Sequence, residues 1–96
     1  MDIDAAPARP AAAMTISPRP SARWFRFAAR VTGVPIREKC RLVVVARDGG
    51  EYTAGVWTVA ADSSLVDGVS VLAPWQVYAV ELRDDAGALL TRRRMI

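Results

Sequence analysis

The sequence predicts an all-β protein: a small antiparallel β-sandwich, immunoglobulin-like or fibronectin-III-like, with six or seven strands. Short alternating or β-branched apolar segments recur at nearly even spacing along the 96 residues, and turn residues separate them. No stretch sustains the period of an amphipathic helix. A partly open barrel is the second architecture that this pattern allows. We place the sandwich domain at residues 12–94, after a disordered Ala- and Pro-rich tail at residues 1–11.

The first two expected strands lie at residues 14–17 and 24–31. The first is a short edge strand, which we expect residues 18–20 to end because proline donates no ladder hydrogen bond. The second has a period of two, with Trp24 and Arg26 on one face. Its other face carries four apolar side chains: Phe25, Phe27, Ala29 and Val31.

The best-marked feature is a hairpin at residues 40–59. Residues 42–45 read Leu-Val-Val-Val, a run with little alternation that predicts a central strand covered on both sides, or nearly so. The Asp-Gly-Gly segment at residues 48–50 supplies the positive φ angles that tight hairpins need. In the returning strand we expect Trp57 to anchor the core. Gly55 either leaves space for a large neighbour or marks a bulge, and on regular alternation it shares a face with Trp57.

The C-terminal third alternates less regularly. We expect a polar loop with one helical turn at residues 61–68, and a short strand at residues 69–72. A last hairpin pairs residues 77–83 with residues 88–91 around an Asp-Asp-Ala-Gly turn. Residues 92–94, three arginines, are expected to form a solvated end. The predicted core consists of the large inward-facing side chains: Phe25, Phe27, Leu42, Val44, Trp57, Val80 and Leu82.

The residue types argue against an enzyme. The chain has no His and one Cys, so it cannot form an internal disulfide or a zinc site of Cys and His ligands. We therefore expect no metal and no cofactor. Cys40, at a strand start with no His to activate it, is expected to be a small buried hydrophobe. The acidic pair Asp84-Asp85 falls on a turn, where its side chains point apart into water. The sequence predicts a non-enzymatic protein with no catalytic residues.

Charge and hydropathy limit the partners that we expect. The net charge is +3, but the thirteen basic residues are scattered and interleaved with ten acids. A nucleic-acid-binding surface normally clusters its basic residues on one face, so nucleic acid is an unfavoured partner. A small cytoplasmic, basic β-domain that binds nucleic acid is kept as the alternative function. No apolar stretch reaches the length of about 20 residues that a membrane span needs, and we expect no signal peptide.

The sequence offers three candidate residues for partner binding: Trp24, Arg26 and Trp75. Trp24 falls on the arginine-bearing face of its strand, where a cation–π contact with Arg26 would leave it half exposed. Trp75 follows a proline in a connection. It either plugs one end of the sandwich or offers an aromatic binding surface.

Residues 33–59 also resemble a known family. The shared motifs are a Gly-Val-Pro turn at residues 33–35, Cys40, the Leu-Val-Val-Val strand, the Asp-Gly turn and an Ala-Gly-Val-Trp return at residues 54–57. As a unit they resemble the extracytoplasmic C-terminal domain of actinobacterial membrane-bound zinc-finger anti-sigma factors. The resemblance extends over about residues 12–92 and rests on turns and core positions.

The resemblance implies a sensor or interaction domain with a protein partner, in a system that regulates transcription initiation negatively through a sigma factor. It implies an extracytoplasmic location when the domain belongs to a membrane-anchored regulator, and a cytoplasmic one otherwise. The family's His-x-x-x-Cys-x-x-Cys module and membrane helix do not occur in this sequence. We therefore expect a fragment or a stand-alone relative of the outer domain, and carry over no sigma-binding residue. A purely structural accessory domain is the third class of function that remains open.

Overall fold

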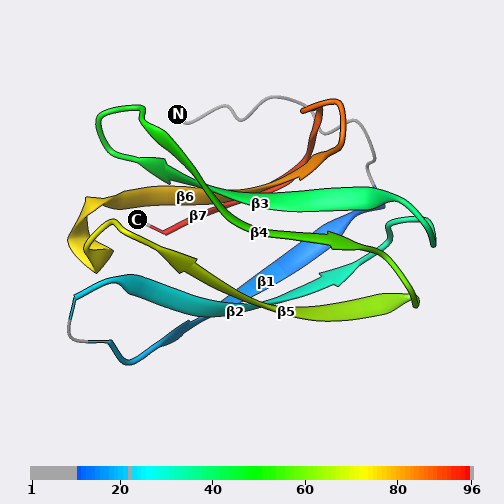
Figure 1. Cartoon of the computed structure of the whole chain (residues 1–96), viewed down its shortest axis with the longest axis horizontal. Coiled ribbons are helices and arrows are strands. Elements are labelled where there is room, and N and C mark those ends of the chain that lie inside the picture. The colour runs from blue at the N-terminus through cyan, green and yellow to red at the C-terminus, as the bar shows by residue number, and fades with distance from the viewer. Residues whose placement is uncertain (1–10, 22, 96) are drawn as a thin grey trace.

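The computed structural model describes residues 11–21 and 23–95, which form two antiparallel β-sheets packed face to face (Figure 1). The strands are β1 (Ala13–Arg19), β2 (Phe25–Thr32), β3 (Lys39–Ala46), β4 (Glu51–Thr58), β5 (Ser63–Ser70), β6 (Val77–Asp84) and β7 (Leu89–Arg94), with a short 3-10 helix η1 (Pro74–Gln76) before β6. The predicted sandwich of six or seven strands is confirmed, and it has seven. Of the tail expected at residues 1–11, only Ala11 falls within the described residues.

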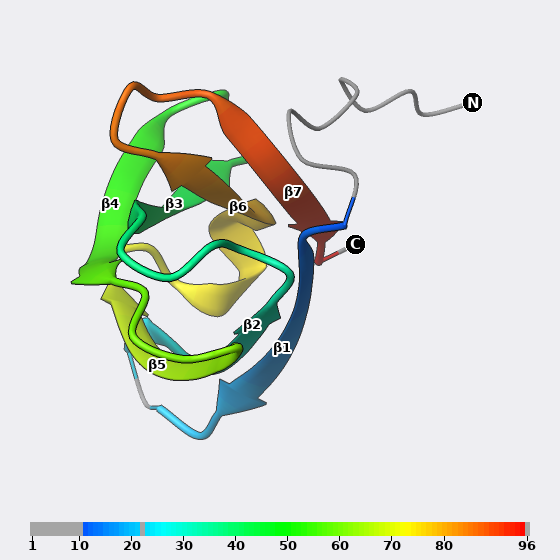
Figure 2. The ribbon, with the colours of Figure 1, turned by 90° about the vertical axis from the view of Figure 1, so that its right-hand side faces the viewer.

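One sheet has three strands in the order β1-β2-β5, and the other has four in the order β4-β3-β6-β7. Every neighbouring pair is antiparallel. Figure 2 looks along the sandwich and shows β4 beside β5 at one margin and β1 beside β7 at the other. Both margins are therefore closed by contact between the sheets, and each sheet keeps one outward face. In the described part of the chain no helix is long and apolar enough to cross a membrane.

The core lies between the two sheets. The inward side chains of β2 are all buried, and the ring of Phe27 stacks on that of Phe25 with 5.0 Å between centroids. Of the residues expected in the core, six are buried: Phe25, Phe27, Leu42, Val44, Val80 and Leu82. Trp57 instead lies at the margin, because it belongs to the edge strand β4, and it packs on the core while staying partly exposed. Cys40 is buried in the cluster.

The hairpin β3–β4 forms as predicted, with one correction. β3 is central between β4 and β6, and Gly49 adopts a φ of 91° in the turn. The register shifts between Leu42 and Val43 and leaves Ala54 without a partner, so the bulge is at Ala54, next to Gly55. Regular alternation would place the side chains of Tyr52 and Trp57 on opposite faces of β4. Because of the bulge, Tyr52 instead pairs with the core residue Val44.

The loop and helical turn expected at residues 61–68 are wrong, since β5 occupies residues 63–70 and pairs with β2 along its whole length. The separate strand expected at residues 69–72 is correspondingly the end of β5. Three of the four inward positions of β5 hold Ser64, Gly68 and Ser70, and the fourth holds Val66, whereas Leu65 and Val69 point outward. The larger apolar side chains of β5 thus lie mostly on its outward face, so apolar periodicity does not identify the strand.

Two strand ends also differ from expectation. β1 continues through Pro18 to Arg19, because β1 is an edge strand and pairs only with β2. β7 includes all three arginines at residues 92–94, which were expected to form a solvated end. Arg92 pairs with Glu81 across the β6–β7 ladder, and Arg94 lies over the ring of Tyr78 at 5.8 Å from its centroid.

Gly68 is a position where the core leaves no room for a side chain. It lies directly opposite Phe27, and a Cβ added there would overlap the Phe27 ring. Because Phe27 is fully buried in the core, its ring has little room to move. We predict that Gly68→Ala lowers the free energy of unfolding by about 1–3 kcal/mol, measured by urea denaturation followed by tryptophan fluorescence.

Gly55→Ala is the matched control. The nearest atom to its added Cβ would be Cγ1 of Val66 at 3.6 Å, an ordinary contact. The substitution should therefore change the free energy of unfolding by less than about 1 kcal/mol. Equal losses of unfolding free energy in Gly68→Ala and Gly55→Ala would contradict the proposed overlap between a side chain at position 68 and the Phe27 ring.

Candidate functional site

The outward surface of the three-stranded sheet carries three arginines on neighbouring strands. We call it the arginine face, and it consists of nine side chains: Thr15, Ser17 and Arg19 from β1, Arg26, Ala28 and Arg30 from β2, and Leu65, Asp67 and Val69 from β5. Their Cα positions pair across the sheet in three rows: Thr15-Arg30-Leu65, Ser17-Ala28-Asp67 and Arg19-Arg26-Val69. The sheet thus gathers residues that are up to 54 positions apart in the sequence.

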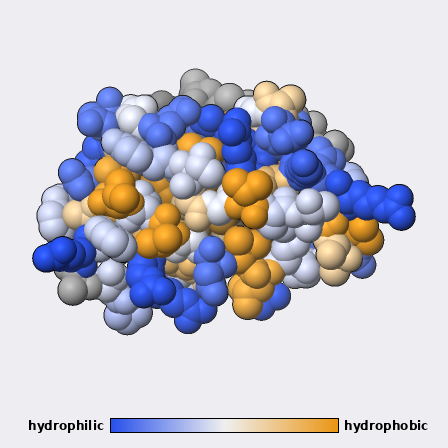
Figure 3. Space-filling model, viewed as in Figure 1, coloured by the Kyte–Doolittle hydropathy of each residue, from blue (hydrophilic) through white to orange (hydrophobic). Residues whose placement is uncertain are grey.

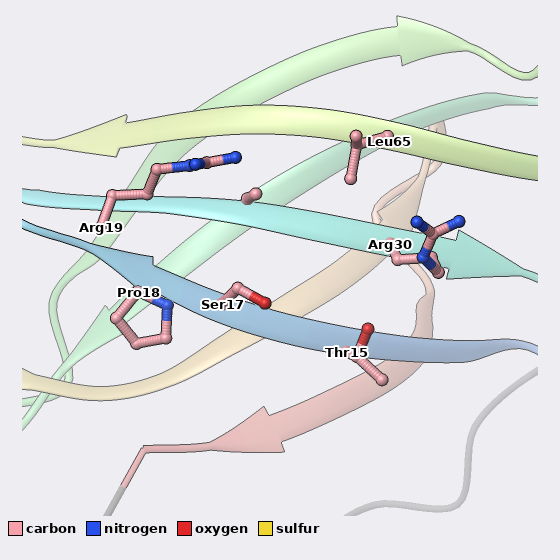
Figure 4. A pocket seen from close by; sticks show the side chains of 7 residues that line it. Thr15, Ser17, Pro18, Arg19, Arg30 and Leu65 are labelled. Atoms are coloured by element: carbon pink, nitrogen blue, oxygen red, sulfur yellow. The ribbon is translucent and has the colours of Figure 1, made fainter.

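The middle row leaves a hollow between the other two. Ser17 and Ala28 are small, and the larger side chains on either side enclose a space of about 370 Å³ over Ala28. Figure 4 shows Arg19 reaching from β1 over β2 at one end, Arg30 at the other end, and Leu65 bordering the hollow from β5. The hydroxyls of Thr15 and Ser17 line the side formed by β1. The hollow therefore offers positive charge at both ends and a small, mixed floor.

The arginines of this face are weakly engaged. Arg19 lies 3.9 Å from the carboxylate of Asp67, and both side chains are mostly exposed, so the pair contributes little. Arg30 donates a long hydrogen bond of 3.5 Å to Ser63. Among the described residues, no ion-pair partner lies within 4 Å of Arg26. Within the described residues, the one carboxylate paired with these three guanidinium groups is that of Asp67 beside Arg19, which leaves the face positive.

Two of the nine side chains of the arginine face, both on β5, are exposed and apolar. Leu65 is 65% exposed and Val69 is 46% exposed. In Figure 3, apolar side chains gather in the middle of the molecular face over β4 and β5. Val56 of β4 adds to this exposed apolar surface. Exposed aliphatic groups next to arginines are typical of surfaces that bind other proteins.

The sequence-predicted partner-binding residues are placed in two regions. Arg26 is on the arginine face, and Trp24 lies just before β2, half exposed, at the end that carries Arg19. The expected contact between Trp24 and Arg26 is not formed: in the described part of the chain, the cation–π contact joins Arg94 and Tyr78 instead.

Trp75 is the most exposed aromatic residue, at 73%, so the expectation that it plugs an end of the sandwich is wrong. It lies in η1 and borders a separate hollow of about 250 Å³. That hollow is lined by Ala46, Arg47, Asp48, Tyr52, Leu72, Trp75 and Gln76. The structure therefore groups Arg26 with Arg19 and Arg30, neither of which was predicted to bind a partner, and leaves Trp75 in another hollow.

The opposite sheet carries a buried ion-pair cluster that sequence reasoning missed. Glu81 is 3% exposed and accepts hydrogen bonds from the Nε atoms of Arg83 at 2.9 Å and Arg92 at 2.8 Å. Arg83 also binds both carboxylate oxygens of Glu51, at 3.0 and 2.9 Å. Glu81 pairs across the ladder with Val43, which is itself buried. The sequence signal for this cluster was the apolar run of β3, because its outward side chains need a cover that excludes water.

This cluster is satisfied internally and is a structural feature. The hydrogen bonds from Arg83 hold the pKa of Glu51 below its usual value, and the same bonds raise the pKa of Arg83. A buried carboxylate held by two guanidinium groups has no spare acceptor capacity for a ligand. Within residues 11–21 and 23–95, no group of three or more Cys, Asp or Glu side chains is arranged to hold a metal ion.

Comparison with known protein families, with curated proteins and with solved structures finds no match. Function is therefore inferred from the residues and their geometry.

The ion pair between Glu51 and Arg83 generates a pH-dependence prediction. A carboxylate whose pKa is lowered by folding stabilises the protein above the unfolded pKa, near 4.3, and this contribution is lost as pH falls through the folded pKa. Glu51→Gln should therefore flatten the fall of unfolding free energy between about pH 5 and pH 3. At pH 7 it should cost under about 1 kcal/mol, because Glu51 is half exposed.

The measurement is urea denaturation of wild type and variant at several pH values. In 1 M salt the difference between them should shrink, since an exposed pair is screened. Identical pH profiles for the two proteins at low salt would contradict the assignment.

Proposed function

We propose that this domain is a non-enzymatic interaction and sensor domain of an anti-sigma-factor system, and that it binds a protein partner through the arginine face. The observation that carries the proposal is the gathering of Arg19, Arg26 and Arg30 beside exposed aliphatic side chains on one sheet. Arginine is enriched at protein interfaces, because its planar group binds carboxylates in pairs and packs against apolar surface.

The resemblance of residues 33–59 to anti-sigma outer domains supports the choice of system. Each matching residue in that segment has a folding role: Cys40 is buried, Gly49 holds a positive φ and Trp57 packs on the core. The segment spans β3 and β4 in the four-stranded sheet, whereas the arginine face belongs to the other sheet. In this proposal the hairpin supplies the frame, and the opposite sheet supplies the contact.

The proposed mechanism is a change in stability on binding. A ligand that binds only the folded state adds about 2.7 kcal/mol to its stability when the ligand concentration is 100 times Kd. For a domain of this size that is a large fraction of the total. Partner binding would thereby change the proteolytic access of an anchored regulator, which is the step that releases a sigma factor in the proposed scheme.

One observation favours a second candidate function. The basic residues are scattered in the sequence, yet three of them share the arginine face, as a nucleic-acid surface requires. Asp67 lies in the middle row of that face, where it would repel a phosphate backbone. The exposed Leu65 also gains nothing from phosphate. Protein binding is therefore preferred.

The test is a two-hybrid screen of the full chain against the sigma factors and sigma regulators of its source genome. We expect at least one interaction, and we expect the double variant Arg26→Glu/Arg30→Glu to abolish it. Arg93→Glu, an exposed site on β7 of the other sheet, is the matched control and should leave it intact. Urea denaturation of each variant verifies that it folds.

Three outcomes would overturn the proposal: no interaction with any component of such a system, an interaction that survives the double variant, or loss with the control. Fluorescence anisotropy with DNA and RNA oligonucleotides at 20 and 200 mM salt is measured in parallel. Salt-sensitive binding to these oligonucleotides that depends on Arg26 and Arg30, with no protein interaction, would establish the second candidate instead.

A further inference from the structure

We propose that the arginine face binds an extended acidic segment of the partner, laid along β2, with two carboxylates four residues apart and a small or apolar side chain midway between them. The inference rests on the proposed function only for the assumption that the occupant is a protein. The kind of segment is argued from the spacing, exposure and charge of the face itself.

The positive charge of the face is concentrated at two poles. Arg26 and Arg30 are four residues apart on the same side of β2, so their Cα atoms are separated by roughly 13 Å. Arg19 pairs directly with Arg26 across the β1–β2 ladder, which places their Cβ atoms roughly 5 Å apart. One pole therefore has two guanidinium groups and the other, at Arg30, has one.

An extended chain matches this spacing. It advances about 3.3 Å per residue, so side chains at positions 1 and 5 point the same way and lie roughly 13 Å apart. Carboxylates four residues apart on an α-helix are separated by only about 6 Å and would reach one pole at a time. For carboxylates four residues apart, the separation of the two poles therefore fits an extended segment and not a helical one.

The hollow between the two poles determines which side chain fits at position 3 of the bound segment, midway between its carboxylates. The hollow of about 370 Å³ lies over Ala28 and is bordered by Leu65 on one side and by the hydroxyl of Thr15 on the other. A side chain such as valine or threonine fits this mixed, partly apolar floor. A third carboxylate would instead approach Asp67, which occupies the same row as Ala28. The face thus favours the pattern acidic-x-small-x-acidic over a continuous run of acids.

Charge complementarity argues for the same occupant. The three guanidinium groups are exposed, and the partners they have among residues 11–21 and 23–95 are weak: a 3.9 Å pair for Arg19 and a 3.5 Å hydrogen bond for Arg30. Within this part of the chain, a carboxylate that binds Arg26 therefore breaks no strong interaction. Two-point binding of an extended segment also explains why the small row lies between the arginines rather than beside them.

The test uses the full chain and a short synthetic peptide, acetyl-Gly-Glu-Thr-Val-Thr-Glu-Gly-amide, whose glutamates stand at positions 1 and 5 of the proposed pattern. One comparison peptide has the same composition with the two glutamates adjacent. The other has glutamine in place of both glutamates. Binding is measured by NMR titration of backbone amide shifts at low salt. We expect the first peptide to bind at least threefold more tightly than the adjacent-glutamate peptide, and the glutamine peptide to bind least.

The variants assign the binding to the two poles. Arg26→Gln and Arg30→Gln should each weaken binding of the first peptide by about threefold to tenfold. Arg30→Lys should weaken peptide binding less than Arg30→Gln, because lysine keeps the positive charge although it lacks the planar guanidinium group. Arg93→Gln, on the other sheet, should have no effect. Shifted amides should lie in β1, β2 and β5.

Equal affinity for the differently spaced peptides, or shifts centred on another surface, would overturn the inference. Failure of this inference and failure of the proposed function are distinguishable. An Arg26-dependent partner in the two-hybrid screen together with no spacing preference among the peptides would refute the extended acidic segment alone. Spacing-dependent peptide binding without any sigma-system partner would refute the proposed function alone.

Discussion

The close approach of Phe27 to Gly68 is the constraint on which the three-stranded sheet depends. The two residues face each other across β2 and β5, and the ring occupies the space that a side chain at position 68 would fill. A slip of one residue in this register would turn every side chain of β5 to the opposite face. The order that places Leu65 beside Arg30 and Asp67 beside Ala28 is therefore a consequence of core packing around one aromatic ring.

The two sheets differ in what covers their outward faces. On the four-stranded sheet, Glu81 and its two arginines lie across the outer side of the central strands and keep Val43 from water. Burying a carboxylate is costly, so such a cluster stabilises only because its hydrogen bonds are complete. On the three-stranded sheet the corresponding positions hold exposed arginines with weak partners. That difference is why the arginine face, and not the Glu81 cluster, is the candidate for contact with another molecule.

Sequence reasoning succeeded where apolar periodicity reports burial. The alternation at residues 25–31 follows from side chains that pack in the core, and the Asp-Gly turn follows from backbone sterics. The apolar run at residues 42–45 follows from cover on both sides of β3, since Leu42 and Val44 lie in the core and Val43 is buried beside Glu81 on the outer side. It failed for β5, where Ser64, Gly68 and Ser70 hold three of the four inward positions and the Phe27 ring leaves no room for a side chain at Gly68. Regular alternation also gives the wrong side for Tyr52, because the bulge at Ala54 offsets the residues before it from those after it.

The arginine face could not be predicted from the sequence for a different reason. Alternation alone places Arg26 and Arg30 on one side of β2, but Arg19 and Leu65 join them only through the pairing order β1-β2-β5, which is a long-range property. The same strand order determines how binding at this face would affect the stability of the sheet. β1 is an edge strand with a proline near its end, and β2 is its one ladder partner. A segment that contacts β1, β2 and β5 together would hold this edge strand against β2, so binding would stabilise the β1–β2 pairing.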